Sequence, residues 1–207
     1  MSTDRRPPAP PPPHGEVAER RQRGAVLVEM AVVGALLVTL VLGVFEIGSL
    51  WGDHQVLTHG ARSGARVGSQ LGTAPETDQQ VLRAIEAAFG PMMETIDRVV
   101  VYEAGRNGEM PVACETATAG YSGSGHCNVY DATAFANLDT APWWGSGTAC
   151  GTADGNWCSV TDRSDDQATA TYLGVSVEME RPYLTGLFGG GTHLMTDTTV
   201  MRIEPET

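Results

Sequence analysis

The chain contains no lysine. All thirteen basic residues among its 207 are arginines, against twenty-five acidic residues, so the formal net charge is −12. From residue 52 onward eight arginines stand against twenty acids, which again gives −12. Because proteins bind nucleic acids largely through basic side chains on the phosphates, this balance argues against a DNA- or RNA-binding protein. It fits a solvated surface outside the cell.

The sequence also lacks the motifs of common catalytic and metal sites. It has no P-loop, no dinucleotide-binding fingerprint and no H-E-x-x-H, and GYSGSG at 120–125 does not complete a nucleophile elbow. The five histidines are scattered without ligand spacing. We therefore predict no enzyme, no cofactor and no metal. A secreted hydrolase without a familiar motif stays an alternative.

What the chain does have is a long apolar run behind a basic cluster. Three arginines at 20–23 precede the run Ala25–Trp51, which only Glu29 and Glu46 interrupt, and Met30–Phe45 carries no charge. As a helix the run is about 40 Å long, which exceeds the ~30 Å hydrocarbon core of a bilayer. A buried core helix is the alternative, but the uncharged stretch has no polar face for water. The sequence predicts a transmembrane helix over 25–51.

The arginines before this span also predict its orientation. Positive charge stays on the cytoplasmic side, so we expect a single-pass protein of the cell membrane with its N-terminus inside and its C-terminal domain outside. Trp51 suits the outer interface. Residues 1–24 form a Pro-rich basic leader, and residues 1–19 are expected to be extended or disordered. A conventional secretory signal peptide ranks second, because no small-x-small cleavage site follows the run.

Glu29 is the unusual residue of the span, because a carboxylate near the start of a membrane helix is costly and usually functional. It is the fifth residue after Gly24, counting Ala25 as the first. A basic leader, Gly-Ala, this glutamate and an apolar helix together resemble the processing site of type IV prepilins. Within that class, RGAVLVEMAVV followed by LLVTLVLGVFEIG resembles the TadE family of pseudopilins from tight-adherence (Flp-type) pilus systems.

The resemblance covers residues 20–72 well and implies a function. A prepilin peptidase would cut after Gly24, Ala25 would become the N-terminus, and Glu29 would be needed for recognition or assembly. Its partners would be the membrane, the peptidase, other pilin-like subunits and the pilus assembly platform. Physically, the new ammonium at Ala25 lies one helical turn from the Glu29 carboxylate, so the two can pair and reduce the cost of charge in lipid.

Beyond the span, glycine recurs at a spacing of four. The residues that share this spacing, and that we expect to serve in helix packing, are Gly60, Gly64, Gly68 and Gly72. A loop is one interpretation, since each helical glycine costs about 1 kcal/mol relative to alanine. We prefer a helix whose small-residue stripe lets another helix approach closely.

Residues 73–207 are predicted to form an extracellular α+β domain. A second helix begins near Thr77, which with Gln80 forms a capping-box pattern, and it carries an apolar stripe at helical spacing. The segment 97–103 is rich in β-branched residues and predicts a strand. Met110–Ala113 is expected to return as its partner strand, after a turn at 105–108.

All four cysteines lie in the Gly-, Ser- and Asp-rich segment 114–158. An even number of cysteines in an exported domain favours disulfides. We prefer nearest-neighbour pairing, Cys114 with Cys127 and Cys150 with Cys158, to the two other pairings. Zinc is a weak alternative, since no C-x-x-C occurs. The acidic residues near 154–166 do not complete a calcium loop, and we expect them to belong to solvated acidic loops instead. Trp143, Trp144 and Trp157 lie nearby and are either a contact surface or a small satellite core.

The C-terminal region is predicted to be a long β-hairpin. Apolar residues alternate with polar ones over 170–180, a Gly-rich turn follows Pro182, and 194–203 returns as a strand. The fold class is therefore α+β, with a long N-terminal transmembrane helix followed by a small domain with an antiparallel sheet. The alternative function is a membrane-anchored extracellular binding module that is not processed.

Overall fold

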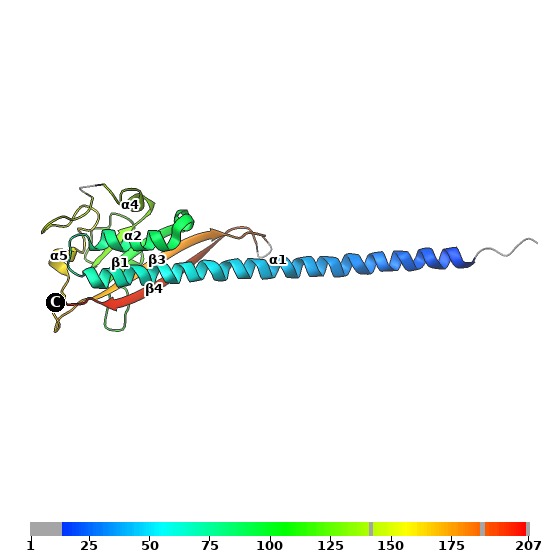
Figure 1. The fold of residues 1–207 in the computed structure, drawn as a ribbon, viewed down its shortest axis with the longest axis horizontal. Helices are drawn as coiled ribbons and strands as arrows, with labels where there is room; N and C mark the ends of the chain where they lie inside the picture. The colour runs from blue at the N-terminus through cyan, green and yellow to red at the C-terminus, as the bar shows by residue number, and fades with distance from the viewer. Residues whose placement is uncertain (1–13, 141–142, 187–188, 206–207) are drawn as a thin grey trace, which may run out of the picture. The chain divides into compact units, whose positions relative to one another are not determined.

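The structure is a computed structural model that describes residues 14–140, 143–186 and 189–205, with side chains from Gly24 onward. The chain divides into two compact units, 1–46 and 47–207. The first consists of the N-terminal part of one long helix. The second holds the C-terminal part of that helix and the remaining helices and strands (Figure 1). The predicted α+β class, with a long apolar helix before a small antiparallel domain, is confirmed.

Helix α1, His14–Leu71, runs without a break for 58 residues. The prediction that residues 52–72 continue as a helix is therefore confirmed to Leu71. The expectation that residues up to 19 are extended is wrong for residues 14–19, which are helical. This segment contains Ala18 and two glutamates, and arginines follow it directly at 20–23; all three residue types are good helix formers. The proline run 7–13 lies outside the described residues.

Helix α2, Thr77–Phe89, is followed directly by a 3-10 helix η1, Gly90–Thr95. The predicted capping box is wrong. Glu76 is the N-cap and makes no side-chain capping bond, while the buried Thr77 hydroxyl donates backwards to the carbonyl of Ala74 at 2.7 Å. Because this hydroxyl faces the preceding turn, it is not available to the first turn of α2.

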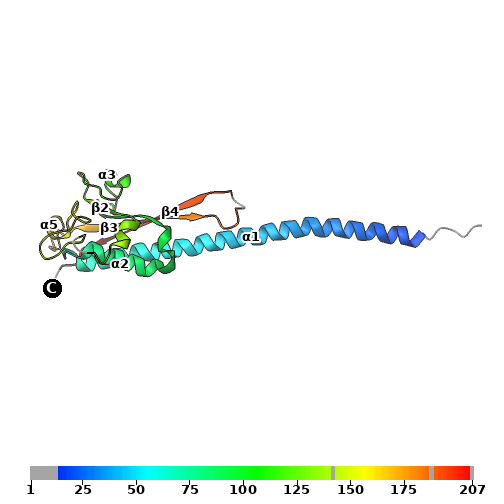
Figure 2. The ribbon, with the colours of Figure 1, turned by 90° about the horizontal axis from the view of Figure 1, so that it is seen from above.

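Four strands form one antiparallel sheet in the order β2-β1-β3-β4. They are β1 Ile96–Glu103, β2 Cys127–Tyr130, β3 Tyr172–Pro182 and β4 Thr192–Arg202. The predicted C-terminal hairpin is confirmed as β3 and β4, which pair from Tyr172↔Arg202 to Pro182↔Thr192. Figures 1 and 2 show the two strands side by side along their length.

The expected partner of β1 at Met110–Ala113 is wrong. This segment leads into a helical turn, α3, Val112–Glu115, and β1 pairs instead with β2 and β3. Cys114 is joined to Cys127 at the start of β2, so the segment is held beside the sheet without entering it. Two further short helices are α4, Ala132–Ala136, and α5, Ser159–Asp162.

The main hydrophobic core lies between one face of the sheet and the two long helices. From β3 it receives the alternating residues Leu173, Val175, Val177 and Met179, none of which is exposed. Helix α1 contributes Leu57, Ala61 and Ala65, and α2 contributes Val81, Leu82, Ile85 and Phe89. A smaller cluster on the other face of the sheet contains Val100, Tyr102 and the Cys114–Cys127 disulfide. The C-terminal part of α1, from Leu57 onward, is therefore one wall of the core.

Candidate functional site

The first candidate site is the apolar surface of α1. Its large side chains are exposed along the whole predicted span, including Met30 at 67%, Phe45 at 61% and Trp51 at 70%. The helix is long and apolar enough to cross a membrane by length and composition, and none of its most apolar window is buried. Glu46 interrupts this surface and is 1% exposed. A surface of this kind is stable in lipid and not in water.

The three residues of the predicted processing site lie on one exposed stretch of α1. Gly24, Ala25 and Glu29 are all exposed, and no atom lies within 4 Å of a side chain built at Gly24. Ala25 and Glu29 are one helical turn apart, about 6 Å along the axis. The Gly24–Ala25 bond thus lies in an accessible segment of α1, and Gly24 lowers the stability of the helix there.

The glycine stripe faces the interior of the second unit. A methyl group added at Gly60 would lie 2.5 Å from the Phe89 ring, and one at Gly64 would lie 3.0 Å from Ile85. At Gly68 it would lie 2.9 Å from Leu173. The stripe therefore lets α2 and β3 of the same chain pack closely against α1. Gly72, after the end of α1, lies similarly close to Ile203.

Two disulfides close the loops that the sequence analysis singled out. The structure pairs Cys114 with Cys127 and Cys150 with Cys158, which is the nearest-neighbour arrangement. The first ties α3 to β2, and the second ties the loop before α5 to the residue preceding that helix. Within the described residues, no group of three His, Cys, Asp or Glu side chains is placed to hold a metal ion.

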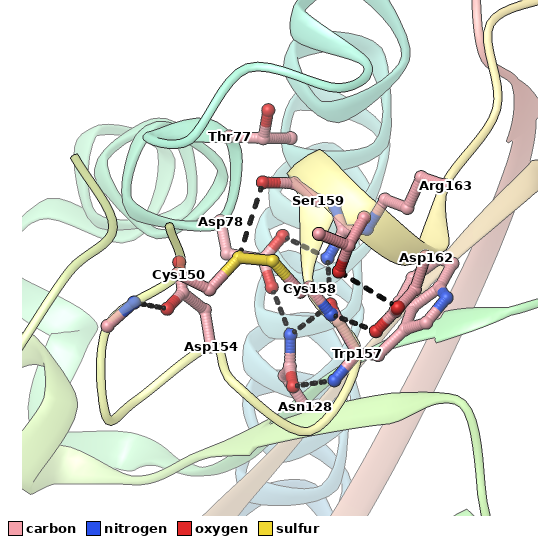
Figure 3. The surroundings of a disulfide bond; sticks show 12 residues. Thr77, Asp78, Asn128, Cys150, Asp154, Trp157, Cys158, Ser159, Asp162 and Arg163 are labelled. Carbon is pink, nitrogen blue, oxygen red and sulfur yellow. Dashed lines mark hydrogen bonds and ion pairs between the residues drawn. A yellow bond between two sulfur atoms is a disulfide. The ribbon is translucent and has the colours of Figure 1, made fainter. Parts of the chain in front are cut away.

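A buried polar network lies beside the second disulfide (Figure 3). Asp78 of α2 forms an ion pair with Arg163 at 2.7 Å, and their side chains are 1% and 0% exposed. The other Asp78 oxygen accepts from the Asn128 amide at 2.7 Å and from the Tyr130 hydroxyl at 2.6 Å. The Arg163 guanidinium also lies 4.0 Å from the centroid of the Trp157 ring. The network joins α2, β2 and the α5 region.

Burial in this region shifts two acid–base equilibria. Desolvation and the nearby Asp78 charge raise the pKa of the Asp154 carboxyl to about 6, although the Gly151 amide donates to it at 2.6 Å. Desolvation, followed by Asp78, also raises the pKa of the Tyr130 hydroxyl well above its usual value. Asp154 is 1% exposed, so it is not one of the solvated acidic residues that the sequence suggested.

The three tryptophans of this region divide between two roles. Trp144 and Trp157 are 6% and 0% exposed and belong to the core, as the satellite-core interpretation expected. Trp143 packs against the core and lines a cavity of about 290 Å³ together with Tyr130 and Thr133. Of these three tryptophans, only Trp143 therefore supports the interpretation that they form a contact surface.

Sequence reasoning missed the ion pairs that join distant segments. Asp78 and Arg163 are separated by 85 positions, and Asp53 of α1 pairs with Arg181 of β3 at 3.0 Å across 128 positions. No spacing rule connects residues this far apart. Asp78 lies in the first turn of α2, where an acidic residue is expected because it interacts favourably with the helix dipole. This local expectation gives no indication of its partner, Arg163.

Comparison with known proteins matches residues 24–66 to the family described as TadE-like protein. No curated protein and no solved structure matches the chain. The matched segment begins at Gly24, contains Ala25 and Glu29, and ends within the glycine stripe. The match confirms the resemblance found in the sequence and supports a pilin-like role associated with a Tad pilus. Residues 24–66 of this chain are therefore a TadE-like segment, and the resemblance to the TadE-like family rests on it.

Proposed function

We propose that this chain is a minor pilin or pseudopilin that a prepilin peptidase cleaves after Gly24 and that takes part in assembling a Flp-type pilus or a related secretion machine. The observation that carries the proposal is the exposed apolar part of α1, residues 25–45, which lies within the TadE-like segment and begins directly after Gly24. It serves as a structural subunit. Its partners are the peptidase, other pilin-like subunits and the assembly platform.

The charge distribution supports an N-terminus inside and a domain outside. Five arginines precede the span and hold that end on the cytoplasmic side. The exterior carries the excess of acids and both disulfides, and disulfides persist in oxidising compartments. The domain 73–207 accordingly faces outward.

Glu29 has a physical role in this proposal. Cleavage creates an ammonium on Ala25, one turn away on the same exposed stretch of α1. In lipid an isolated carboxylate is costly, and a cation on the same helix or on a neighbouring subunit's N-terminus offsets that cost. The pair then sets the register at which subunits pack in the membrane.

The test is the N-terminal residue of the mature protein, extracted from the membranes of its own host. We expect a start at Ala25. Gly24→Leu should block processing, whereas Gly34→Leu should not, because both glycines are helical with open surroundings and only the first adjoins the cleavage site. Glu29→Gln keeps the side-chain volume and should impair assembly.

Two other outcomes would replace the proposal. Retention of the leader in the wild-type protein makes the helix a plain anchor, and the binding module then becomes the leading function. The cavity beside Trp143 is its starting point. A start beyond Trp51 indicates ordinary secretion and removes the role assigned to Glu29.

A further inference from the structure

Strand β4 forms one edge of the sheet, and half of its backbone groups point away from the other strands. In an antiparallel pair, only every second residue exchanges hydrogen bonds with its partner strand. Beyond the two ends of the hairpin ladder, the Tyr183 amide donates to the Gly191 carbonyl at 3.2 Å, and the Ile203 amide donates to the Thr171 carbonyl at 2.9 Å. Both pairs continue the register of β3 with β4, so the odd-numbered residues of β4 bond to β3.

The even-numbered residues of β4 therefore direct their amide and carbonyl groups outward. They are Thr192, Leu194, Thr196, Thr198, Val200 and Arg202. All except the half-buried Val200 are exposed, Leu194 to 57%. Within the part of the chain that the structure describes, no hydrogen bond reaches these outward backbone groups. The edge is open over eleven residues, which is about 34 Å.

The opposite edge of the sheet is protected in a way that β4 is not. β2 has only four residues, and the Asn156 side-chain amide donates to its Cys127 carbonyl at 2.8 Å. β4 pairs with β3 in one continuous register and contains neither proline nor lysine, two residues that commonly protect edges. An open edge of this length can accept a strand from another chain.

Arg62 of α1 lies beside this edge. Helix α1 contacts β4 near both ends of the strand, because His54 lines a cavity with His193 and the Ser69 hydroxyl lies 3.9 Å from the Met201 sulfur. Steps of three or four residues, which keep to one face of a helix, lead from His54 through positions 58, 62 and 65 to Ser69. Arg62 is therefore on the side of α1 that faces β4, and it is exposed.

Arg66 follows Arg62 by one helical turn and is exposed as well. Neither arginine forms an ion pair within the described residues, although acids outnumber arginines by twenty to eight from residue 52 onward. Two like charges four residues apart on a helix repel each other. Carboxylates supplied by another chain would offset this repulsion by pairing with both arginines.

The two arginines are level with the C-terminal half of β4. Measured back from the Ser69–Met201 contact, Arg66 lies about 5 Å and Arg62 about 10 Å along α1. β4 runs in the same direction as α1, so the same distances lead about one to three residues back from Met201. This places the arginines beside residues 198–200, at the open edge.

We propose that the outward edge of β4 accepts an extended segment of a different protein chain, with acidic side chains that pair with Arg62 and Arg66. The segment becomes an additional strand of the sheet. Its backbone bonds to the even-numbered residues of β4 supply affinity, and its carboxylates supply specificity. The inference needs neither a bilayer around α1 nor processing at Gly24.

The positions of the arginines also determine where the acids of the partner lie. Both arginines are on the helix-facing side of the sheet, which in β4 is the side of the odd-numbered residues, since Met195 belongs to the core. Acidic side chains opposite Thr199 and Met201 therefore come closest to the arginines. The position opposite Asp197 should be uncharged, because like charges directly across two strands destabilise the pair.

A second copy of the chain fits this edge less well. Its own β4 offers a single acid, Asp197, together with Arg202. Antiparallel pairing of two β4 strands would also turn the two α1 helices in opposite directions, whereas subunits anchored in one membrane point the same way. The Pro-rich leader is unsuitable too, because proline has no amide hydrogen to donate. Charge therefore favours an acidic segment of another chain.

The test is amide hydrogen exchange, followed by NMR, on the full chain in detergent micelles with and without a synthetic peptide. The peptide alternates threonine and valine and carries glutamates where it lies opposite Thr199 and Met201. In the free chain the amides of Thr196 and Thr198 should exchange fast and that of Thr199 slowly, because only Thr199 bonds to β3. Added peptide should slow the exchange of both outward amides.

Variants with matched controls separate the backbone from the charges. Thr196→Pro removes one outward amide hydrogen, and proline is tolerated at a sheet edge, so this variant should lose the protection at Thr198 while Thr196→Ala keeps it. Slow exchange at Thr199 in both variants shows that the sheet is intact. Arg62→Gln with Arg66→Gln should weaken peptide binding by about two- to thirtyfold, as expected for two exposed ion pairs. Arg106→Gln, in an exposed turn, should leave it unchanged.

Three outcomes would overturn the proposal. Fast exchange at Thr196 and Thr198 with the peptide in excess shows that the edge does not accept a strand. Equal weakening by Arg106→Gln and by the double variant shows that Arg62 and Arg66 do not select the acids. Slow exchange at both outward amides without peptide, which becomes fast on dilution, indicates that a second copy already occupies the edge.

Discussion

Replacing Arg163 with methionine tests whether the buried network stabilises the second unit, residues 47–207. The substitution removes the cation that lies 2.7 Å from the Asp78 carboxylate, and neither side chain is more than 1% exposed. Removing one partner of a buried ion pair costs about 3–5 kcal/mol, because the other charge stays without compensation. Asn128 and Tyr130 still donate to Asp78, so the lower half of this range is expected.

The cost is measured as a change in melting temperature. One kcal/mol lowers the Tm of a domain of 150–250 residues by about 2–4 °C, so a loss of about 3–4 kcal/mol should make Arg163→Met melt about 6–16 °C below the wild type. The full chain in detergent micelles is heated while near-ultraviolet circular dichroism follows the buried Trp144 and Trp157. Asp139→Asn is the matched control, because its pair with Arg83 is 85% and 40% exposed and is worth less than about 1 kcal/mol.

A double substitution separates the pair from its neighbours. Asp78→Leu with Arg163→Met removes both charges, and it should be less destabilising than the sum of the two single changes. Additive losses would show that the two side chains are not coupled. If Arg163→Met melts with the Asp139→Asn control, the reasoning about the buried charge is wrong.

Three further results are expected of the second unit. Gly60→Ala should destabilise this unit by up to about 2 kcal/mol, because the added methyl group overpacks against α2. Gly52 has open surroundings, so Gly52→Ala should instead stabilise α1 by up to about 1 kcal/mol. Urea unfolding measures both changes. In the folded state the pKa of Asp154 is raised to about 6, so the folded state binds more protons than the unfolded state between about pH 4 and 6. The contribution of Asp154 to the free energy of unfolding therefore falls as the pH rises. The melting temperatures at pH 5 and pH 7 should differ less in Asp154→Asn than in the wild type. Converting the pair Cys150–Cys158 to serines should cost about 2–3 kcal/mol for its short loop, and a reductant should then lower the urea midpoint less than in the wild type.

Elements with strong local periodicity were predicted correctly. The alternation of Leu173 with Val175 and Val177 needs only the period of a strand, and the stripe of α2 needs only the period of a helix. The helix over residues 52–72 was predicted despite its glycines, because their regular spacing indicates a packing stripe. The partners of that stripe are α2 and β3 of the same chain, which spacing alone does not identify.

The errors arose where tertiary contacts override local signals. Thr77 has a neighbour pattern typical of a cap, but burial turns its hydroxyl toward Ala74. Met110–Ala113 follows a good turn, yet the edge of β1 is taken by β2. Asp154 has the sequence context of a solvated loop acid, and only the fold shows that it is buried. In each case the deciding neighbour is remote in sequence or is determined by packing.

The last turns of α1 have a practical consequence for producing the second unit as a soluble fragment. A fragment chosen by composition alone would start near residue 73, after the apolar and glycine-rich stretches. It would lack Leu57, Ala61 and Ala65 and would open one side of the core to water. Starting at Asp53 instead keeps these residues and the bond to Arg181 and omits the exposed Trp51. The shortest fragment that keeps this core closed therefore includes about five turns of α1.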